Sequence, residues 1–260
     1  MAVTILKHAQ IGDIPPTPLT PYSDQREIRQ ACNLLEKYAL HYGMPTAYKQ
    51  EQNGQLIHSI VPNPNTENDQ ISSSSKVDLQ LHTETAFHPF KPSHVILMCL
   101  RGDENAQTTY ALAEDIASKL DDQTLSALME PNFITRIDDS FRTHGESDRE
   151  FRKQIFSRLP NGELSICFDE FFMRADESVE GASEALEKLK SVIPECVKEV
   201  TLETGDVMIM DNRKVIHGRK SFIARYDGTD RWLLRILVSQ NLPPRGQYIH
   251  FDHITITTDL

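Results

Sequence analysis

A series of short strand-like segments, separated by turn residues, constrains the fold of this chain more than any other feature. Many of them lie in the C-terminal third, and the set reads QLIHSIV, VDLQLH, HVILMCL, ELSICF, VKEVTLE, DVMIMD, KVIHG, RWLLRILVS and HITITT. HVILMCL is a continuous apolar run, short enough to be a strand that is buried on both faces. Many short strands with few helices favour an antiparallel barrel or a double-sheet jelly roll. We therefore expect a mainly β fold with flanking helices.

Helices are expected at four places between these strands. The first covers residues 24–43, where Asp24 can cap the helix and Gly43 can end it. Apolar residues at helical spacing predict three more, over residues 108–120, 123–129 and 179–192. Residues 62–76 are rich in Pro, Asn and Ser, so this stretch is expected to be a loop.

The chain is expected to form a single domain over residues 1–260. Its length suits one large β-rich domain and allows a sizeable core. The segment 142–153 is dense in charge and has no hydrophobic period, so we expect it to be an exposed insertion. We interpret the wider stretch around residues 140–180 as a lid insertion in this domain.

Composition excludes several classes of function. The formal net charge of −11 argues against a nucleic-acid partner, because phosphate binding requires clustered Lys and Arg. The sequence has no run of about 18 apolar residues and no secretory signal, so we expect no membrane association and a cytoplasmic location. The 4 cysteines lie far apart without a CxxC pair, which fits a reducing compartment.

The strongest local motif is His82-Thr83-Glu84, at the end of the segment VDLQLH. Residues i and i+2 of a strand point to the same face, so His82 and Glu84 can converge on one ion. Two imidazole nitrogens and one carboxylate on one face form the facial triad of non-haem iron(II) oxygenases, which leaves coordination positions open. The His-x-Glu motif alone is a weak signal, because it also occurs by chance in many proteins of this size.

A more distant histidine and two arginines complete the pattern. His217 lies in DVMIMDNRKVIHGRK, and Arg231 and Arg235 follow it in RWLLR. Arg231 and Arg235 are four residues apart on an expected strand, so they share a face. A buried arginine is the expected bidentate partner for the far carboxylate of a dicarboxylic keto acid. Burying two arginines side by side costs folding free energy unless anions bind to them.

The segments HTETAFHPF, DNRKVIHGR and RYDGTDRWLLR resemble the clavaminate synthase-like branch of the iron(II)/2-oxoglutarate-dependent oxygenases. Within that branch, the chain is most similar to the arginine and lysine hydroxylases that act on free amino acids. The resemblance covers roughly residues 50–240 and implies a distorted double-stranded β-helix, or jelly roll. It also implies Fe(II) as the cofactor, and 2-oxoglutarate and O2 as the two co-substrates.

The resemblance assigns roles to individual residues. It implies His82, Glu84 and His217 as iron ligands. Arg231 resembles the anchor of the far carboxylate of 2-oxoglutarate, and Thr108, placed at the start of the expected helix 108–120, resembles the hydroxyl that assists it.

The implied substrate contacts are Arg235, Asp169 and Ser72. Arg235 resembles the residue that binds the substrate carboxylate, and Ser72 belongs to a loop that resembles a substrate- or co-substrate-contacting one. Asp169, in CFDEFF, resembles an acid that binds a guanidinium in the arginine hydroxylases. Those enzymes have a second acid where this chain has Phe171, which weakens the case for arginine as the substrate.

The expected activity is hydroxylation of an unactivated carbon of an L-amino acid or an amino-acid-derived metabolite, with release of succinate and CO2. Desaturation or ring formation by the same chemistry stays open, as does a non-catalytic jelly-roll binding protein. A zinc hydrolase would have no use for the paired arginines. Glu84 argues against a halogenase, which needs its position open. Three further histidines are expected to be structural: His58, His88 and His94.

Overall fold

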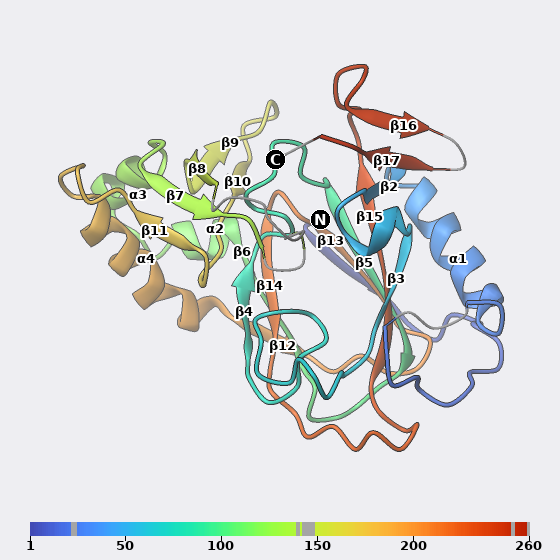
Figure 1. Cartoon of the computed structure of the whole chain (residues 1–260). Helices are drawn as coiled ribbons and strands as arrows, with labels where there is room; N and C mark the ends of the chain where they lie inside the picture. The colour runs from blue at the N-terminus through green and yellow to red at the C-terminus, as the bar shows by residue number, and fades with distance from the viewer. Residues whose placement is uncertain (22–24, 139–140, 142–148, 251–252, 259–260) are drawn as a thin grey trace.

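The structure is a computed structural model that describes residues 1–21, 25–138, 141, 149–250 and 253–258. Its largest sheet has 8 strands among these residues, and Figure 1 shows it on the same side of the molecule as the first helix. Its strand order begins β1 (Val3–Leu6), β13 (Val207–Asp211), β5 (His94–Arg101) and β15 (Trp232–Ser239). It continues through β2 (Met44–Tyr48), β17 (Ile254–Ile256) and β16 (Tyr248–His250), while β3 (Ile57–Ile60) also pairs with β15.

A second sheet of four strands packs against the first. Its order is β12 (Lys198–Val200), β6 (Thr108–Leu112), β14 (Val215–Arg219) and β4 (Leu79–His82). Apolar side chains from both sheets form one buried cluster, which includes Leu97, Met208, Val215 and Leu233. All described strand pairs in the two sheets are antiparallel except β17 with β2. Two facing, mainly antiparallel sheets are the jelly-roll arrangement. The expected mainly β class with flanking helices is confirmed.

Helix α1 (Arg29–Leu40) covers the outer face of the large sheet. Its buried residues Ala31, Leu35 and Ala39 pack in a cluster with Ile96 and Leu234 of the sheet. The helix begins at Arg29, which is later than the predicted residue 24. Asp24, the predicted cap, lies outside the described residues.

Three helices pack beside the smaller sheets. Helix α2 (Ala113–Ala117), α3 (Asp122–Leu128) and α4 (Ala182–Cys196) contribute to a separate apolar cluster. The helix predicted over residues 123–129 is confirmed as α3, where Asp121 accepts a hydrogen bond from the Thr124 amide at 2.8 Å. The helix predicted over residues 179–192 exists, but α4 starts later and ends later, at Cys196.

The prediction of one helix over residues 108–120 is wrong in its first half. Thr108–Leu112 is strand β6, which pairs with β14 on one side and β12 on the other. Thr and Tyr favour strands, and strand partners on both sides outweigh a weak helical pattern. Only Ala113–Ala117 is helical, so Thr108 opens a strand and not a helix.

The segment predicted as an exposed insertion is partly a strand. Residues 142–148 lie outside the described residues, but β8 (Glu150–Lys153) pairs with β7 (Phe133–Arg136), which also pairs with β11 (Met173–Ala175). In β8, Phe151 and Lys153 are half-buried while their neighbours are exposed, so a two-residue period was present in this charged sequence. A hairpin of β9 (Phe156–Arg158) and β10 (Leu164–Ile166) follows. A lid role for residues 140–180 stays a prediction.

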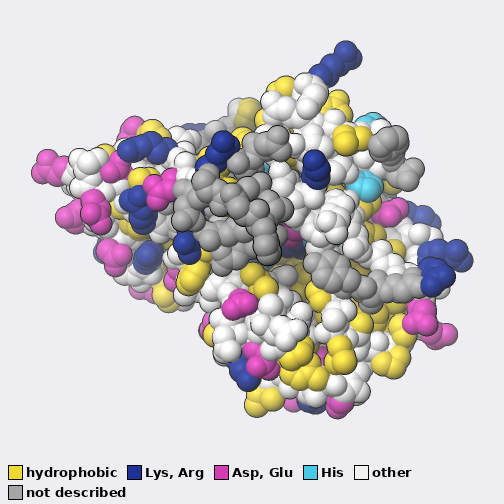
Figure 2. All heavy atoms as spheres, in the orientation of Figure 1, with side chains coloured by type: hydrophobic (Ala, Val, Ile, Leu, Met, Phe, Trp, Pro, Cys, Tyr) yellow, Lys and Arg dark blue, Asp and Glu magenta, His cyan; other side chains and the backbone are white. Residues whose placement is uncertain are grey.

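Charge is distributed over the surface without a basic patch on the face shown in Figure 2, where acidic and basic side chains are interspersed. None of the helices in the part of the chain that the structure describes is long and apolar enough to cross a membrane.

Candidate metal centre and active site

His82 and His217 lie opposite each other on two paired strands. His82 ends β4, and the register of β4 with β14 places His217 directly across from it. The two imidazole rings are 4.6 Å apart between centroids. With Glu84 they form a group in which one ligand atom from each residue lies within 4.8 Å of the others. The structure therefore brings together the three residues that the sequence proposed as ligands.

Glu84 is positioned differently from the prediction, because it lies beyond the end of β4 and not on the strand. The chain turns after His82, with Thr85 at a φ of 51°. The buried side chain of Asn212 then fixes this turn: its Oδ1 accepts from the Glu84 amide at 2.8 Å, and its Nδ2 donates to the Glu84 carbonyl at 3.1 Å. The sequence reasoning missed Asn212, although it stands in the motif DNRKVIHGR.

The protonation states suit a cation. Burial opposes ionisation of Glu84, but Arg235 and His217 outweigh it and hold the pKa of the carboxyl well below its usual range. Burial, together with the neighbouring His82, lowers the pKa of His217 and favours its neutral ring. His82 Nδ1 lies 2.9 Å from the Gln80 carbonyl; donation there leaves Nε2 free as a ligand. Two neutral imidazoles and one carboxylate are a donor set that fits iron(II).

Arg231 and Thr108 lie together on the far side of a cavity that His217 also lines. Arg231 precedes β15 and is 7% exposed, and its Nη2 lies 3.4 Å from the Thr108 hydroxyl. Burial lowers the pKa of Arg231 to about 10. Among the described residues, no carboxylate forms a salt bridge with it. A buried guanidinium without a carboxylate partner is suited to an anionic ligand.

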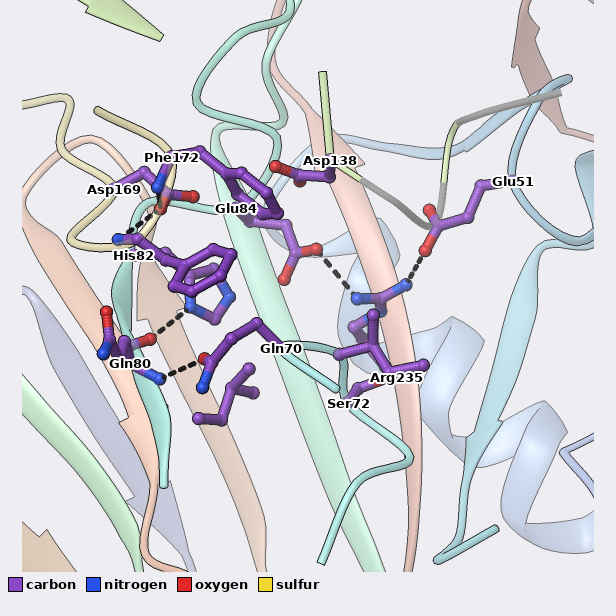
Figure 3. Close-up of a pocket in the computed structure, with 13 residues that line it drawn as sticks. Glu51, Gln70, Ser72, Gln80, His82, Glu84, Asp138, Asp169, Phe172 and Arg235 are labelled. Atoms are coloured by element: carbon purple, nitrogen blue, oxygen red, sulfur yellow. Dashed lines mark hydrogen bonds and ion pairs between the residues drawn. The ribbon is translucent and has the colours of Figure 1, made fainter. Parts of the chain in front are cut away.

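Arg235 is paired with two carboxylates, as Figure 3 shows. Its Nη1 donates to Glu84 Oε1 at 2.8 Å, and its Nη2 contacts both Glu51 and His58 Nδ1, the latter at 2.7 Å. Burial lowers the pKa of Arg235, but Glu51 and Glu84 outweigh it and raise that pKa above its ordinary value. Glu51 was not among the residues proposed from the sequence, and His58, expected to be structural, also contacts this arginine.

Comparison with known proteins identifies the family. The family model described as "Taurine catabolism dioxygenase TauD, TfdA family" matches residues 21–237. The chain belongs to this TauD/TfdA dioxygenase family. Enduracididine beta-hydroxylase of Streptomyces hygroscopicus is 34% identical over 87% of this chain and 70% of the relative. L-asparagine oxygenase of Streptomyces coelicolor is 35% identical over 88% of this chain and 68% of the relative.

A solved structure of a TauD/TfdA-like oxygenase has the same fold. Asparagine oxygenase in complex with Fe(II), (2S,3S)-3-hydroxyasparagine and succinate superposes with a TM-score of 0.87 at 31% identity, over 99% of this chain and 80% of that chain. The resemblance stated from the sequence, the jelly-roll fold and the enzyme class are confirmed. As a TauD/TfdA dioxygenase, the chain is an oxygenase that depends on iron(II), 2-oxoglutarate and O2.

Asp169 lies beside the candidate metal centre of this TauD/TfdA dioxygenase. It forms an isolated bridge with His82, and its Oδ1 accepts from the amides of Phe171 and Phe172 at 3.0 and 2.7 Å. Burial raises the pKa of Asp169. A turn places Asp169, Phe171 and Phe172 along one cavity, whereas the carboxylate of Glu170 accepts a hydrogen bond from the amide of Leu81 at 3.4 Å.

Ser72 lines the cavity beside Asp169 and also the one beside Arg231. The two cavities share further residues, among them His82, Glu84 and Arg235, so they meet at the metal centre. Every residue that the sequence proposed for the site therefore lines one of these two adjoining cavities: His82, Glu84, His217, Arg231, Thr108, Arg235, Asp169 and Ser72.

Proposed function

We propose that this oxygenase hydroxylates an unactivated carbon of an L-α-amino acid, or of a small amino-acid-derived metabolite. One observation carries the proposal: the charges along the cavity alternate, because Arg235 lies between the carboxylates of Glu51 and Glu84. All three residues are less than 10% exposed. An α-amino acid presents a carboxylate next to an ammonium group, so such a row of charges is complementary to it.

Arg235 and Glu51 would bind the two charged groups of the substrate. Arg235 has five N–H donors and uses only some of them on Glu84, Glu51 and His58, and its Nε has no hydrogen-bond partner within the described residues. It can therefore also bind the substrate carboxylate. Glu51 Oε2, which likewise has no partner there, would accept from the α-ammonium group.

We propose His82, Glu84 and His217 as the iron ligands, and Arg231 with Thr108 as the anchor of the far carboxylate of 2-oxoglutarate. The iron supplies the oxidising chemistry when it is bound, and the co-substrate leaves as succinate and CO2. The protein itself favours the neutral ring of His217, holds Glu84 ionised and fixes the position of the substrate. Placement decides which carbon reacts, since a displacement of about 1 Å lowers the rate sharply.

The far end of the substrate would lie beside Asp169 and two aromatic rings. Phe171 and Phe172 meet edge to face, with centroids 4.8 Å apart, and the Arg136 guanidinium lies 4.8 Å from the Phe172 ring. One acid beside aromatic rings suits a single polar or cationic group better than a guanidinium held by two acids. The named relatives act on asparagine and on enduracididine, which bear a polar and a cationic side chain.

The segment around residues 140–180 would act as the lid of this cavity. Asp138, Asp169 and Phe172 line the cavity at the two ends of that stretch. The segment is also hydrogen-bonded to the motif His82-Thr83-Glu84, because the Thr83 amide donates to the Phe168 carbonyl at 2.7 Å. Movement of this segment would therefore reach the metal centre directly.

The test is succinate formation with iron(II) and 2-oxoglutarate across the twenty L-amino acids. We expect a small number of them to stimulate turnover, and Asp169→Asn to change which ones do.

His82→Ala and His217→Ala should abolish turnover and also the weak visible absorption of the anaerobic complex with iron(II) and 2-oxoglutarate. Stimulation only by compounds without a carboxylate would disprove the amino-acid proposal. Full activity in either histidine variant would disprove the ligand assignment.

A further inference from the structure

Arg219 is a further buried arginine in the cavity that holds Arg231, which Arg235 also lines. It lies on β14 two residues after the proposed ligand His217, and the register places it opposite Thr108 of β6. Residues at this spacing on a strand point to the same face. Arg219 is 3% exposed and lines the cavity together with Thr108, His217 and Arg231.

The guanidinium of Arg219 is only partly satisfied. Its Nη2 donates to the Ser74 hydroxyl at 2.8 Å and to the Val77 carbonyl at 3.2 Å. Its Nε and Nη1 are buried and have no hydrogen-bond partner in the part of the chain that the structure describes. Its guanidinium carbon lies 5.1 Å from the centre of the Phe222 ring. Such orphaned donors are costly, and each points to a group that the protein itself does not supply.

The charges in this cavity are also unbalanced. The hydrogen-bond partners of Arg219 and Arg231 among the described residues are neutral oxygens, those of Ser74, Val77 and Thr108. Within the described residues, neither arginine forms a salt bridge with a carboxylate, whereas Arg235 forms two. Two buried cations in one cavity repel each other and are expensive to desolvate unless an anion lies between them. Glu84 also lines this cavity, but its carboxylate is paired with Arg235. The two unpaired arginines therefore suit an anion that can accept charge-assisted hydrogen bonds from both.

We propose that Arg219 is a second anchor for the far carboxylate of 2-oxoglutarate, which it shares with Arg231. The proposal rests on the proposed function, in which Arg231 binds that carboxylate. Residues i and i+2 on a strand lie about 7 Å apart, a span comparable with the length of a five-carbon dicarboxylate. A molecule held at one end beside His217 thus presents its other end near Arg219. A carboxylate has two oxygens, so it can accept from both guanidinium groups.

A purely structural role is the competing explanation. Through Ser74 and Val77, Arg219 tethers the loop that contains Ser72, and loss of this tether would disturb the whole site. The two roles differ in one respect. An anchor senses the charge at the far end of the ligand, whereas a tether affects every ligand of the cavity equally.

The experiment is calorimetric titration of the anaerobic iron(II) protein with two ligands, 2-oxoglutarate and 2-oxopentanoate. The second has the same chain length but a methyl group in place of the far carboxylate. Arg219→Met should weaken binding of 2-oxoglutarate by about 10- to 150-fold, the range for a hydrogen bond to a charged group, and should leave 2-oxopentanoate within about twofold. Arg219→Lys keeps the positive charge but lacks the planar guanidinium with its paired N–H donors. It should therefore show a smaller loss of affinity, also confined to 2-oxoglutarate.

Ser74→Ala is the matched control, because it removes the side-chain hydrogen bond of the tether and keeps the cation. It should leave the affinity for both ligands near the wild-type value. Equal losses for both ligands in the Arg219 variants, or no loss for 2-oxoglutarate in Arg219→Lys and Arg219→Met, would overturn the proposal. If Arg219→Met does not fold, Arg219→Lys with Ser74→Ala still decides between the two roles. Absence of 2-oxoglutarate binding by the wild-type protein would instead disprove the proposed function.

Discussion

Glu84 and Arg235, which are 151 residues apart in the chain, form a buried ion pair in which Nη1 donates to Oε1 at 2.8 Å. The other oxygen of Glu84 lies 3.5 Å from His217 Nε2. One carboxylate thus joins the proposed substrate-binding cation to the proposed metal centre. Through this contact Arg235 keeps Glu84 ionised, and any ligand that draws on Arg235 also changes the environment of a candidate iron ligand.

Arg231 and Arg235 should therefore have separable roles. We expect Arg231→Ala to raise the KM for 2-oxoglutarate far more than the KM for the amino acid. Arg235→Ala should do the reverse. A charge-assisted bidentate contact is worth about 1.5–3 kcal/mol, or about 10- to 150-fold. Steady-state measurements with each ligand varied in turn give the two constants. Equal effects of both substitutions on both ligands would contradict the division.

Glu51 should recognise the α-ammonium group. Glu51→Gln keeps the size of the side chain but removes its charge, so we expect the KM for the amino acid to rise about tenfold or more. The requirement for 2-oxoglutarate should change little, because Glu51 does not line the cavity of Arg231. The matched substrate is the α-hydroxy acid with the same side chain. If Glu51→Gln raises the KM for the α-hydroxy acid as much as the KM for the amino acid, Glu51 does not bind the ammonium group.

Asn212 should act as a positioning residue for Glu84. It is 1% exposed and holds the backbone of Glu84 through two hydrogen bonds. Asn212→Ala is expected to weaken iron(II) binding by about 10- to 100-fold, the range for groups that orient a metal ligand. The measurement is the metal affinity of the folded protein by competition with a chelating dye. The control is Asn241→Ala on the surface, and equal metal affinity of the two variants would refute the role.

Asp211 should stabilise the turn that carries Asn212. Its carboxylate accepts from Arg213 Nε at 2.8 Å and Nη2 at 2.7 Å. Burial raises the pKa of Asp211, but the hydrogen bonds from Arg213 outweigh this and lower it. A lowered folded-state pKa adds stability above the unfolded pKa of about 3.9, and this stability is lost as the pH falls through the folded value.

Asp211→Asn should consequently lower the free energy of unfolding at pH 7 by about 1–2 kcal/mol, since Arg213 is partly exposed. The difference from wild type should shrink below about pH 4. Urea unfolding at pH 7, 5 and 3 measures it, with Glu187→Gln on the exposed face of α4 as the control. A difference that stays constant across this range would show that the ion pair is not its source.

The sequence alone predicted the class of the fold, and it singled out residues that the structure brings together at the candidate metal centre. His82 and Glu84 are separated by one residue, and Arg231 and Arg235 by three, so each pair stays close along the chain and lines one cavity, although Glu84 lies beyond β4 and Arg231 precedes β15. The strand-like segments also identified β3, β5, β13, β14 and β15, and the short, continuous apolar run of β5 is the clearest of these signals. Thr108 was placed in the site by the resemblance, but its local structure was predicted wrongly.

Only the tertiary structure revealed what surrounds these residues. Glu51 meets Arg235 across 184 residues of sequence, and Asn212 meets Glu84 across 128. Thr108 lies in a strand because β12 and β14 flank it, which a local pattern does not record. Motif residues can be read from the sequence because their spacing fixes their direction. Their partners cannot, because a side chain on a distant loop acquires its neighbours only when the two sheets pack face to face.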